Sequence, residues 1–268
     1  MFKIKGSDSK KLSNNILTLS QVAALAKKNN PNVINATIGM FNNEDDEFYT
    51  FKSVSQVLKE VSFYDAFSYA DTSGGEGYQQ AILKWVFGDY LSSFKSTHHI
   101  GVIATPGGSG CIATTFENYL NKGDNVLVPS VMWETYITMA KERECGVLRY
   151  DLYDSDNNFN LSDLRSKILE LMNKQESIIL VINDPCHNPT GFCMKDSDYD
   201  ALVDLLNEYD YPFVLLMDIA YFDFYDCDPN IIRSRYHKLS RLNSNVLINF
   251  ATWLNNSFNP SPVTAEIL

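Results

Sequence analysis

Apolar and polar residues follow two different periodicities along the chain, and the two alternate. In some segments apolar residues recur every three or four positions, a spacing that predicts amphipathic helices. Between these segments lie short apolar runs, which predict strands. The predicted helices are 18–30, 51–61, 77–94, 111–123, 133–144, 161–175 and 197–210, and the predicted strands are 32–39, 100–106, 124–129, 146–153, 177–184, 213–224 and 245–252.

This alternation of strands and helices indicates an α/β protein. Strands with continuous apolar cores, separated by helices, predict a mostly parallel sheet with helices on both faces, which makes a three-layer sandwich. Sheets of this kind bind ligands at the carboxyl ends of their strands. With 268 residues, 45% of them hydrophobic, the chain can bury the core of one large domain, alone or with a small one.

Composition and charge exclude several classes of function. The net charge of -11 and the pI near 4.8 would repel the phosphates of a nucleic acid. No apolar run is long enough to span a bilayer, and the first residues lack the apolar stretch of a secretory signal. The five cysteines form an odd, scattered set, which suits a reducing compartment. We therefore expect a cytoplasmic protein that binds neither nucleic acid nor membrane.

The sequence TPGGSG at 105–110 joins a predicted strand to a predicted helix. Unpaired backbone N–H groups at the start of such a helix bind phosphate, together with the positive end of the helix dipole. Gly107 and Gly108 would supply N–H groups, and the Ser109 hydroxyl would add another donor. The segment is neither a P-loop nor a dinucleotide fingerprint. A tight strand–helix turn without any ligand explains it equally well.

The sequence HNPTG at 187–191 follows a predicted strand. Pro189 fixes its own backbone and favours an extended Asn188, so that the Asn188 amide is aimed and can donate to a phenolate-type oxygen. An Asx-type turn is the alternative. A metal site is a second alternative, with the candidate ligands Cys186, His187 and Cys193. We disfavour it because no second cluster of ligands accompanies these three residues.

Two further stretches bring an acidic or aromatic side chain to a strand end. Asp218 ends an apolar run, so its carboxylate would be largely buried, which is costly unless it meets a cation. Tyr221, three residues later, can point into the same cleft. Trp133, at the start of a predicted helix, can stack on a planar ring. The alternatives are a helix-capping or loop aspartate and a tryptophan that packs in the core.

One ligand would meet all of these elements. It carries a phosphate, a flat aromatic ring, an oxygen that accepts hydrogen bonds and a cationic ring nitrogen, as pyridoxal 5'-phosphate does. HNPTG, followed about thirty residues later by MDIAYFDF, resembles the fold-type I pyridoxal-phosphate aminotransferases of class I/II, the aspartate and aromatic aminotransferase group. The resemblance extends from NATIG, at 35–39, to LINF, at 247–250.

The resemblance implies roles in cofactor binding for the matching residues. Gly107, Gly108 and Ser109 resemble the cup that holds the phosphate, and Trp133 resembles the residue that stacks on the pyridine ring. Asn188 and Tyr221 match the pair that donates to the ring oxygen. Asp218 matches the partner of the pyridine N–H⁺, which keeps the ring cationic so that it can accept electrons.

The resemblance also implies contacts with the substrate and with a second subunit. Gly39 matches a glycine whose backbone lies near the substrate carboxylate, and Trp133 and Asn188 would border the substrate too. Tyr69 resembles a tyrosine that reaches the phosphate of the neighbouring subunit, so we expect a homodimer. The expected domains are 1–45, an arm with part of a small domain, and 46–268, a large cofactor-binding domain that is incomplete at its C-terminus.

The family's Schiff-base lysine has no counterpart in this sequence. In the family this lysine follows the D-x-A-Y motif by about thirty residues, binds the cofactor and moves a proton from the substrate α-carbon. Here the last lysine is Lys238 and no arginine follows Arg241. From Ala251 the sequence departs from the family pattern, which we interpret as C-terminal truncation or a frameshift.

From this resemblance we expect an aminotransferase that moves an amino group from an aromatic or dicarboxylic amino acid to a 2-oxo acid. The chain itself would be inactive, because the lysine is absent. The alternative is a non-catalytic protein that keeps the fold and binds pyridoxal phosphate or a partner without turnover. A lyase or decarboxylase is a third, weaker interpretation.

Overall fold

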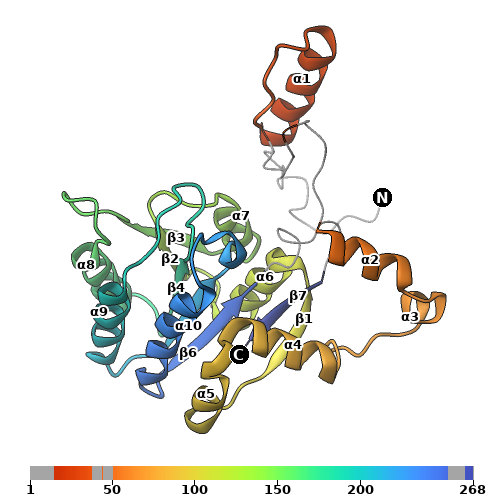
Figure 1. The fold of residues 1–268 in the computed structure, drawn as a ribbon. Coiled ribbons are helices and arrows are strands. Elements are labelled where there is room, and N and C mark those ends of the chain that lie inside the picture. The colour runs from red at the N-terminus through yellow and green to blue at the C-terminus, as the bar shows by residue number, and fades with distance from the viewer. Residues whose placement is uncertain (1–14, 38–43, 45–50, 253–262, 268) are drawn as a thin grey trace, which may run out of the picture. The chain divides into compact units, whose positions relative to one another are not determined.

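The computed structural model describes residues 15–37, 44, 51–252 and 263–267 (Figure 1). The chain divides into two compact units, Met1–Lys52 and Ser53–Leu268. The first unit contains helix α1 (Asn15–Asn29), which confirms the helix predicted at 18–30.

The strand predicted at 32–39 is wrong over residues 32–37, the part of it that the structure describes. These residues form a turn and irregular backbone. An asparagine side chain explains the difference, because such side chains bond to nearby groups in place of a sheet partner. The Asn35 Oδ1 accepts hydrogen bonds from the backbone N–H of Thr37 at 3.2 Å and from the Thr37 hydroxyl at 2.7 Å.

The second unit is built around a sheet whose described strands number seven, in the order β1-β7-β6-β5-β4-β2-β3. β7 runs antiparallel to both of its neighbours, and all other neighbouring strands pair in parallel. The mostly parallel α/β sheet predicted from the sequence is therefore confirmed. The strands are β1 (Val102–Pro106), β2 (Asn125–Pro129), β3 (Gly146–Tyr150), β4 (Ile178–Asn183), β5 (Phe213–Asp218), β6 (Val246–Ala251) and β7 (Val263–Ile267).

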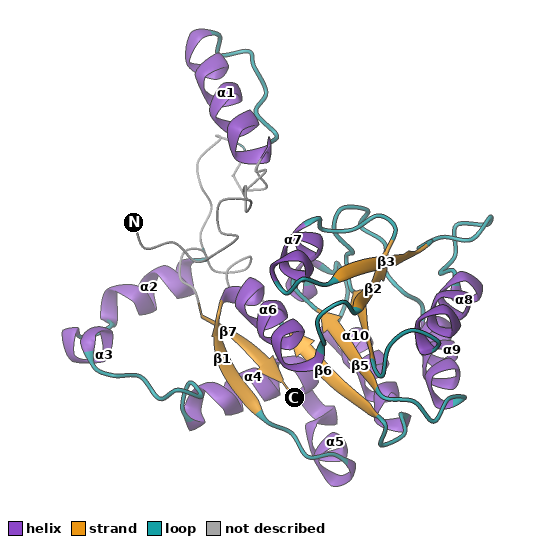
Figure 2. Cartoon of the chain, turned by 180° about the vertical axis from the view of Figure 1, so that it is seen from behind, coloured by secondary structure: helices purple, strands orange, loops and turns teal. Residues whose placement is uncertain are grey.

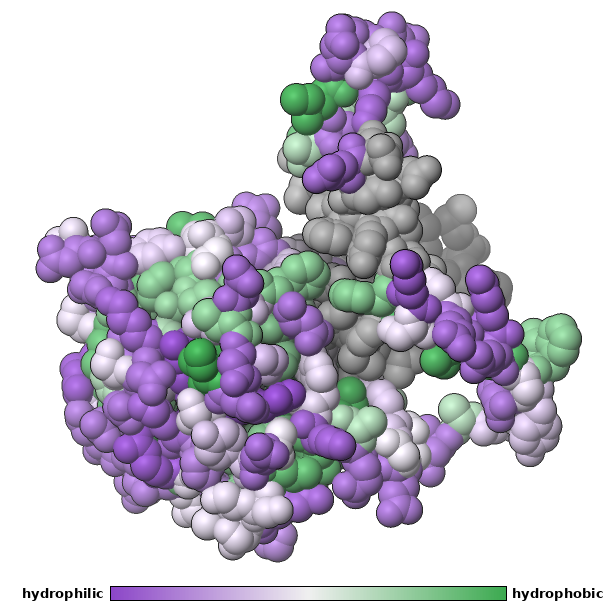
Figure 3. Space-filling view, viewed as in Figure 1, coloured by the Kyte–Doolittle hydropathy of each residue, from purple (hydrophilic) through white to green (hydrophobic). Residues whose placement is uncertain are grey.

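The remaining helices confirm most of those predicted, with ends that shift by a few residues. None of the helices in the described part of the chain has the length and apolar character needed to cross a bilayer. Hydrophilic side chains predominate over α8 and α9 in the space-filling view (Figure 3). The helices are α2 (Lys52–Glu60), α3 (Phe63–Phe67), α4 (Glu76–Phe87), α5 (Leu91–Thr97), α6 (Gly107–Tyr119), α7 (Thr135–Glu142), α8 (Leu161–Met172), α9 (Asp196–Asn207) and α10 (Pro229–Lys238).

Helices cover both faces of the sheet, which confirms the predicted three layers (Figure 2). Successive residues of a strand point to opposite faces, so the fully apolar β4 contributes to two cores. Ile178, Leu180 and Ile182 belong to the larger core, which also contains residues of α4, α5, α8, α9 and α10. Ile179 and Val181 belong to the smaller core, beneath α6 and α7.

The helix predicted at 77–94 is broken at Gly88 into α4 and α5. Gly88 has a φ of 52°, a left-handed conformation that favours glycine. A Cβ there would also lie 2.8 Å from the Cδ of Arg233. The Arg233 Nε and Nη2 donate to the carbonyl oxygen of Trp85 at 3.1 and 2.8 Å, in the last turn of α4, where helix carbonyls lack partners within the helix. This contact joins α4 to α10.

Three segments after residue 213 differ from the prediction. The strand predicted at 213–224 ends at Asp218, and residues 222–224 form a short 3-10 helix, η3 (Phe222–Phe224). Helix α10 and strand β7 occupy segments for which the sequence predicts no element. Asp228 explains where α10 begins, because its side chain accepts from the N–H of Asn230 at 2.9 Å and Pro229 follows it as the first helical residue.

Candidate functional site

The strands β4, β5 and β6 end at the same level of the sheet. Asn183 pairs in register with Asp218, and Asp218 pairs with Ala251, and each is the last residue of its strand. The segments that follow β4 and β5 contain the predicted site residues Asn188 and Tyr221. The fold therefore brings predicted residues from separate parts of the sequence to one edge of the sheet.

The two residues predicted to bind the ring oxygen are in direct contact. The Asn188 Nδ2 donates to the Tyr221 hydroxyl at 2.9 Å, and both side chains are half-buried. Burial raises the pKa of Tyr221 and the nearby Asp218 carboxylate raises it further, so Tyr221 remains a neutral phenol. The amide retains a second N–H and the phenol retains its O–H, so both groups can donate to one further oxygen atom.

Asn183, which the sequence did not single out, holds Asn188 in place. Its Oδ1 accepts from the backbone N–H of Asn188 at 2.7 Å, and its Nδ2 donates to the carbonyl oxygen of Asp218 at 2.8 Å. Asn183 is buried, with 5% of its surface exposed. It therefore ties the HNPTG loop to the end of β5. A polar residue that ends an otherwise apolar strand is the signal that could have identified it.

The HNPTG loop is closed by hydrogen bonds of its own. The N–H of Gly191 donates to the carbonyl oxygen of His187 at 2.7 Å, and the His187 Nδ1 lies 2.9 Å from the Thr190 Oγ1. The Asn188–Pro189 peptide bond is cis. Burial lowers the pKa of His187 to about 4, so the ring is neutral near pH 7. A backbone hydrogen bond thus closes this tight turn, whereas the Asn188 side chain, which an Asx-type turn would use, is directed towards Tyr221.

Asp218 is a buried carboxylate, as the sequence predicts, with 3% of its surface exposed. Its Oδ2 accepts a hydrogen bond from the Tyr136 hydroxyl at 2.5 Å, and its Oδ1 accepts from the N–H of Ala220 at 3.2 Å. Burial raises the pKa of Asp218 to about 6, against the lowering effect of these two hydrogen bonds. Among the described residues no cation pairs with it. The carboxylate is therefore buried without the positive charge that would offset the cost of burial.

Tyr136 and Trp133 lie together next to this carboxylate. Their ring centroids are 5.5 Å apart with an interplanar angle of 88°, an edge-to-face contact. Trp133 is half-buried and packs against the smaller core, so the core-packing alternative describes part of its environment. Tyr136 is a functional candidate that the sequence analysis missed. Trp133 lies two residues before α7, and its carbonyl oxygen accepts from the N–H of Tyr136 at 3.2 Å. The spacing of three residues within the helix predicted at 133–144 was the available signal.

Helix α6 begins at Gly107, directly after β1. This is four residues before the start predicted from the sequence, at 111. Gly107 has a φ of 75°, and a Cβ on Gly110 would lie 2.9 Å from the Cδ of Pro106, so the turn requires glycine at both positions. Gly107 and Gly108 are buried and Ser109 is exposed. α6 packs against α7, the helix of Tyr136, so the start of α6 and Tyr136 lie on the same face of the sheet.

Tyr69, one of the other two predicted residues, is not among the described residues that contact one another at this edge. Tyr69 is fully exposed on the loop between α3 and α4, and among the described residues it has no hydrogen bond or ring contact with another candidate. Its predicted contact involves a second subunit and stays a prediction. Gly39 lies outside the described residues.

The metal-site alternative gains no support from the geometry around the HNPTG loop. Within residues 15–37, 44, 51–252 and 263–267, no group of three or more histidine, cysteine, aspartate or glutamate side chains is arranged to hold a metal ion.

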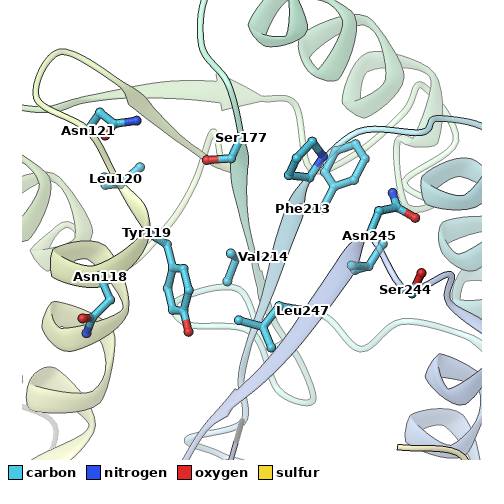
Figure 4. A pocket seen from close by; sticks show the side chains of 12 residues that line it. Asn118, Tyr119, Leu120, Asn121, Ser177, Phe213, Val214, Ser244, Asn245 and Leu247 are labelled. Atoms are coloured by element: carbon cyan, nitrogen blue, oxygen red, sulfur yellow. The ribbon is translucent and has the colours of Figure 1, made fainter.

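A pocket of about 490 Å³ opens at the opposite edge of the sheet, where β5 and β6 begin (Figure 4). None of the predicted site residues lines it, so it is separate from the site at the carboxyl ends of the strands. Its lining residues are Asn118, Tyr119, Leu120, Asn121, Ser177, Pro212, Phe213, Val214, Ser244, Asn245, Val246 and Leu247.

Comparison with known proteins relates this site to an enzyme family. The family described as aminotransferase class I and II matches residues 31–248. The chain belongs to this family. The tyrosine aminotransferase of Klebsiella pneumoniae is 26% identical to this family member over 193 residues, which are 70% of this chain and 47% of the relative. The chain thus spans about half the length of the curated relative that it matches.

Solved aminotransferases share the fold of this family member. An aminotransferase from Anaerococcus prevotii superimposes with a TM-score of 0.91 at 25% identity, over 100% of this chain and 66% of that one. An aromatic-amino-acid aminotransferase from Burkholderia pseudomallei, described as covalently bound to pyridoxal phosphate, has a TM-score of 0.77 at 21% identity, over 99% of this chain and 65% of that one.

Replacing Asn183 tests whether its amide supports the site of this family member. We expect Asn183→Ala to lower the free energy of unfolding by about 2 kcal/mol, because two hydrogen bonds of a buried amide are lost. Hydrogen exchange at the Asn188 amide should accelerate as well. Asn118→Ala is the control, since Asn118 is exposed on α6 and its loss should change stability by less than about 0.5 kcal/mol. Equal urea midpoints for the two variants would contradict the role of Asn183.

The raised pKa of Asp218 predicts a pH-dependent stability difference. A carboxyl whose pKa rises from 3.8 to about 6 on folding adds stability below pH 3.8 that is lost as the pH rises through 6. Asparagine cannot ionise, so we expect Asp218→Asn without cofactor to be more stable than the parent at pH 7, by at most about 3 kcal/mol. The difference should shrink towards pH 4. Urea unfolding of both proteins at the two pH values measures it, and a variant less stable than the parent at pH 7 would contradict the assignment.

Proposed function

We propose that this chain binds pyridoxal 5'-phosphate at the carboxyl ends of β4 and β5 and the start of α6, in a protein that transfers amino groups from amino acids to 2-oxo acids. The observation that carries the proposal is the buried carboxylate of Asp218, which no cation offsets in the described part of the chain. A protonated pyridine nitrogen is a cation of suitable shape for that position. The contact between Asn188 and Tyr221 adds support, because both groups retain donors for a phenolate oxygen.

The other candidate residues fit the remaining parts of the same cofactor. The first turn of α6, with Gly107, Gly108 and Ser109, would hold the phosphate through N–H groups and a hydroxyl. Trp133 would cover one face of the ring. When bound, the cofactor supplies an electron sink for the substrate carbanion. The residues of the chain would orient the ring and keep its nitrogen protonated through Asp218.

Tyr136 would act as a positioning residue for Asp218. Its hydroxyl donates to the Asp218 Oδ2 at 2.5 Å. Burial holds the pKa of Tyr136 well above its ordinary value and the Asp218 charge adds to the effect, so the phenol remains a donor at neutral pH. A donor to a carboxylate favours the ionised form. Tyr136 would therefore both orient the carboxylate and support the charge that the ring nitrogen requires.

We further propose that these 268 residues bind the cofactor without a covalent bond and without turnover. The family resemblance calls for a lysine after β6, and no lysine follows Lys238 in the sequence. Lys238 ends α10, where its Nζ donates to the Asp200 carboxylate at 2.7 Å and to the Asp196 carbonyl at 3.1 Å. These partners lie on α9 and hold the amine on the side of the larger core. The non-catalytic alternative thus describes this chain, and amino transfer describes its family.

The proposed amino-group donor is an aromatic or dicarboxylic amino acid. The relative from Klebsiella pneumoniae, a tyrosine aminotransferase, supports the aromatic class. A cytoplasmic location belongs to the same proposal, because all five cysteines are free thiols, as a reducing compartment would keep them. Fractionation of cells that express the chain would test the location.

Titration with pyridoxal 5'-phosphate, followed by absorbance and tryptophan fluorescence, tests the proposed site. We expect saturable binding that dialysis reverses and that sodium borohydride does not fix. Asp218→Asn should weaken binding at least about tenfold, because a neutral amide does not pair with a pyridinium. Asp204→Asn, at an exposed position on α9, is the matched control and should leave the affinity unchanged.

Two results would contradict this proposal. A borohydride-stable adduct on one lysine, located by peptide mass spectrometry, would exclude the non-covalent mode of binding. An affinity that is the same for the parent and for Asp218→Asn would exclude Asp218 as the partner of the ring nitrogen.

We also propose that the chain forms a homodimer through a surface that includes α3. Apolar side chains gather over α3 (Figure 3), where Phe63, Tyr64 and Phe67 are 85%, 80% and 81% exposed. Exposed patches of this kind mark protein contacts. Sedimentation velocity should show a dimer for the parent and a shift towards monomer for Phe67→Ser. A monomeric parent at micromolar concentration would contradict the proposal.

A further inference from the structure

Cys186 and Cys193 face each other across the base of the HNPTG loop. Their sulfur atoms are 3.9 Å apart. The backbone N–H of Cys186 donates to the Cys193 Sγ at 3.2 Å, which holds that sulfur towards Cys186. Both side chains are half-buried and retain access to solvent.

Hydrogen bonds on either side hold the two cysteines opposite each other. On the loop side, the N–H of His187 donates to the carbonyl oxygen of Phe192 at 2.9 Å. On the other side, the N–H of Met194 donates to the buried Asp184 carboxylate at 2.7 Å. The chain therefore folds back on itself at this point, and the proximity of the two sulfur atoms follows from the backbone rather than from side-chain rotation alone.

The other three thiols have different surroundings. Cys111 and Cys145 are buried in the smaller core, whereas Cys227 is exposed. Within the pair, burial raises the pKa of the Cys186 thiol, and the neighbouring Cys193 raises it further. Because the thiolate is the nucleophile in disulfide exchange, the raised pKa assigns Cys186 to the second step, in which it attacks a sulfur that already lies 3.9 Å away.

We propose that Cys186 and Cys193 form a reversible disulfide by exchange with a small-molecule disulfide such as oxidised glutathione. The Cys193 thiolate attacks one sulfur of the glutathione disulfide, whose S–S bond breaks as one glutathione thiolate leaves. Cys186 then gives its proton to solvent and attacks the Cys193 Sγ, which releases the second glutathione thiolate. Two protein thiols are thereby oxidised and one glutathione disulfide is reduced to two thiols. Excess reduced glutathione reverses both steps.

The disulfide would displace the loop that carries Asn188. An S–S bond is about 2.05 Å long, so the two sulfur atoms must approach by roughly 1.9 Å. Asn188 lies between the two cysteines, and its 2.9 Å contact with Tyr221 depends on the position of the loop. We expect the oxidised chain to bind pyridoxal 5'-phosphate about tenfold more weakly, an expectation that rests on the proposed function.

Peptide mass spectrometry after oxidation tests the disulfide directly. The purified chain is incubated with oxidised glutathione, its remaining thiols are blocked with N-ethylmaleimide in denaturant, and it is digested with trypsin. Both cysteines fall in the tryptic peptide 175–195, because it contains no internal lysine or arginine. We expect this peptide to lose two hydrogens and carry no maleimide. After treatment with reduced glutathione it should carry a maleimide on each cysteine.

The chain provides its own controls for this experiment. Cys227, which is exposed, should acquire glutathione and show that the reagent acts. Cys227→Ser should still form the disulfide, whereas Cys193→Ser should leave Cys186 without an intramolecular partner. Maleimide on both cysteines of the 175–195 peptide, while Cys227 carries glutathione, would overturn the proposal. A stable glutathione adduct on Cys193 with a maleimide on Cys186 would overturn it too.

Cofactor titrations of the oxidised and reduced chains separate this proposal from the proposed function. A tenfold loss of affinity on oxidation of the parent, with no loss for Cys193→Ser, would support the coupling between the disulfide and Asn188. Equal affinities for a chain that mass spectrometry shows to be oxidised would overturn that coupling. A reduced chain that binds no cofactor, but forms the disulfide, would overturn the proposed function and support the disulfide.

Discussion

Asp218 holds the candidate site together through its side chain and its backbone at once. Its carboxylate accepts from Tyr136 at 2.5 Å, and its carbonyl oxygen accepts from the Asn183 amide at 2.8 Å and from the N–H of Asp184 at 3.2 Å. One residue therefore joins α7, β4 and β5. It does so because it is the last residue of β5, where side chains of neighbouring segments can reach its backbone. The position of Asn188 depends on this arrangement, because its N–H donates to Asn183, which in turn donates to the Asp218 carbonyl oxygen.

A comparison of the two buried aspartates shows why only one of them suits a ligand. Burial raises the pKa of both Asp184 and Asp218 to about 6. The two oxygens of Asp184 accept from the Tyr199 hydroxyl and the Met194 N–H, both at 2.7 Å, so the chain itself satisfies this carboxylate. Asp218 has one comparably short hydrogen bond, and its second donor lies at 3.2 Å. Asp184 thus anchors the end of the HNPTG loop, whereas Asp218 retains capacity for a cationic partner.

The sequence predicted those features of the site and fold that depend on short stretches of neighbouring residues. Asn188, Asp218 and Tyr221 lie at or just after the ends of apolar runs, and in a parallel sheet such positions converge on one edge. Tyr136 could not be predicted in the same way, because its contact with Asp218 joins residues 82 apart and depends on how α7 packs. The helix break at Gly88 and strand β7 were missed for a similar reason. Each is determined by distant segments, α10 in one case and β1 with β6 in the other.

In the proposed site, ring binding and covalent chemistry would depend on different strands. The side-chain hydrogen bonds that position Asn188 and the Asp218 carboxylate come from α7, β4 and the segment after β5, and none of them passes through β6. Ala251, in register with Asp218, and Thr252 are buried, so β6 reaches the same edge. The sequence that follows, TWLNNSF, offers hydroxyl and amide groups but no amine. In the proposed site, the contacts that would hold the ring do not involve that segment, so recognition of the cofactor would not require a nucleophile at the end of β6.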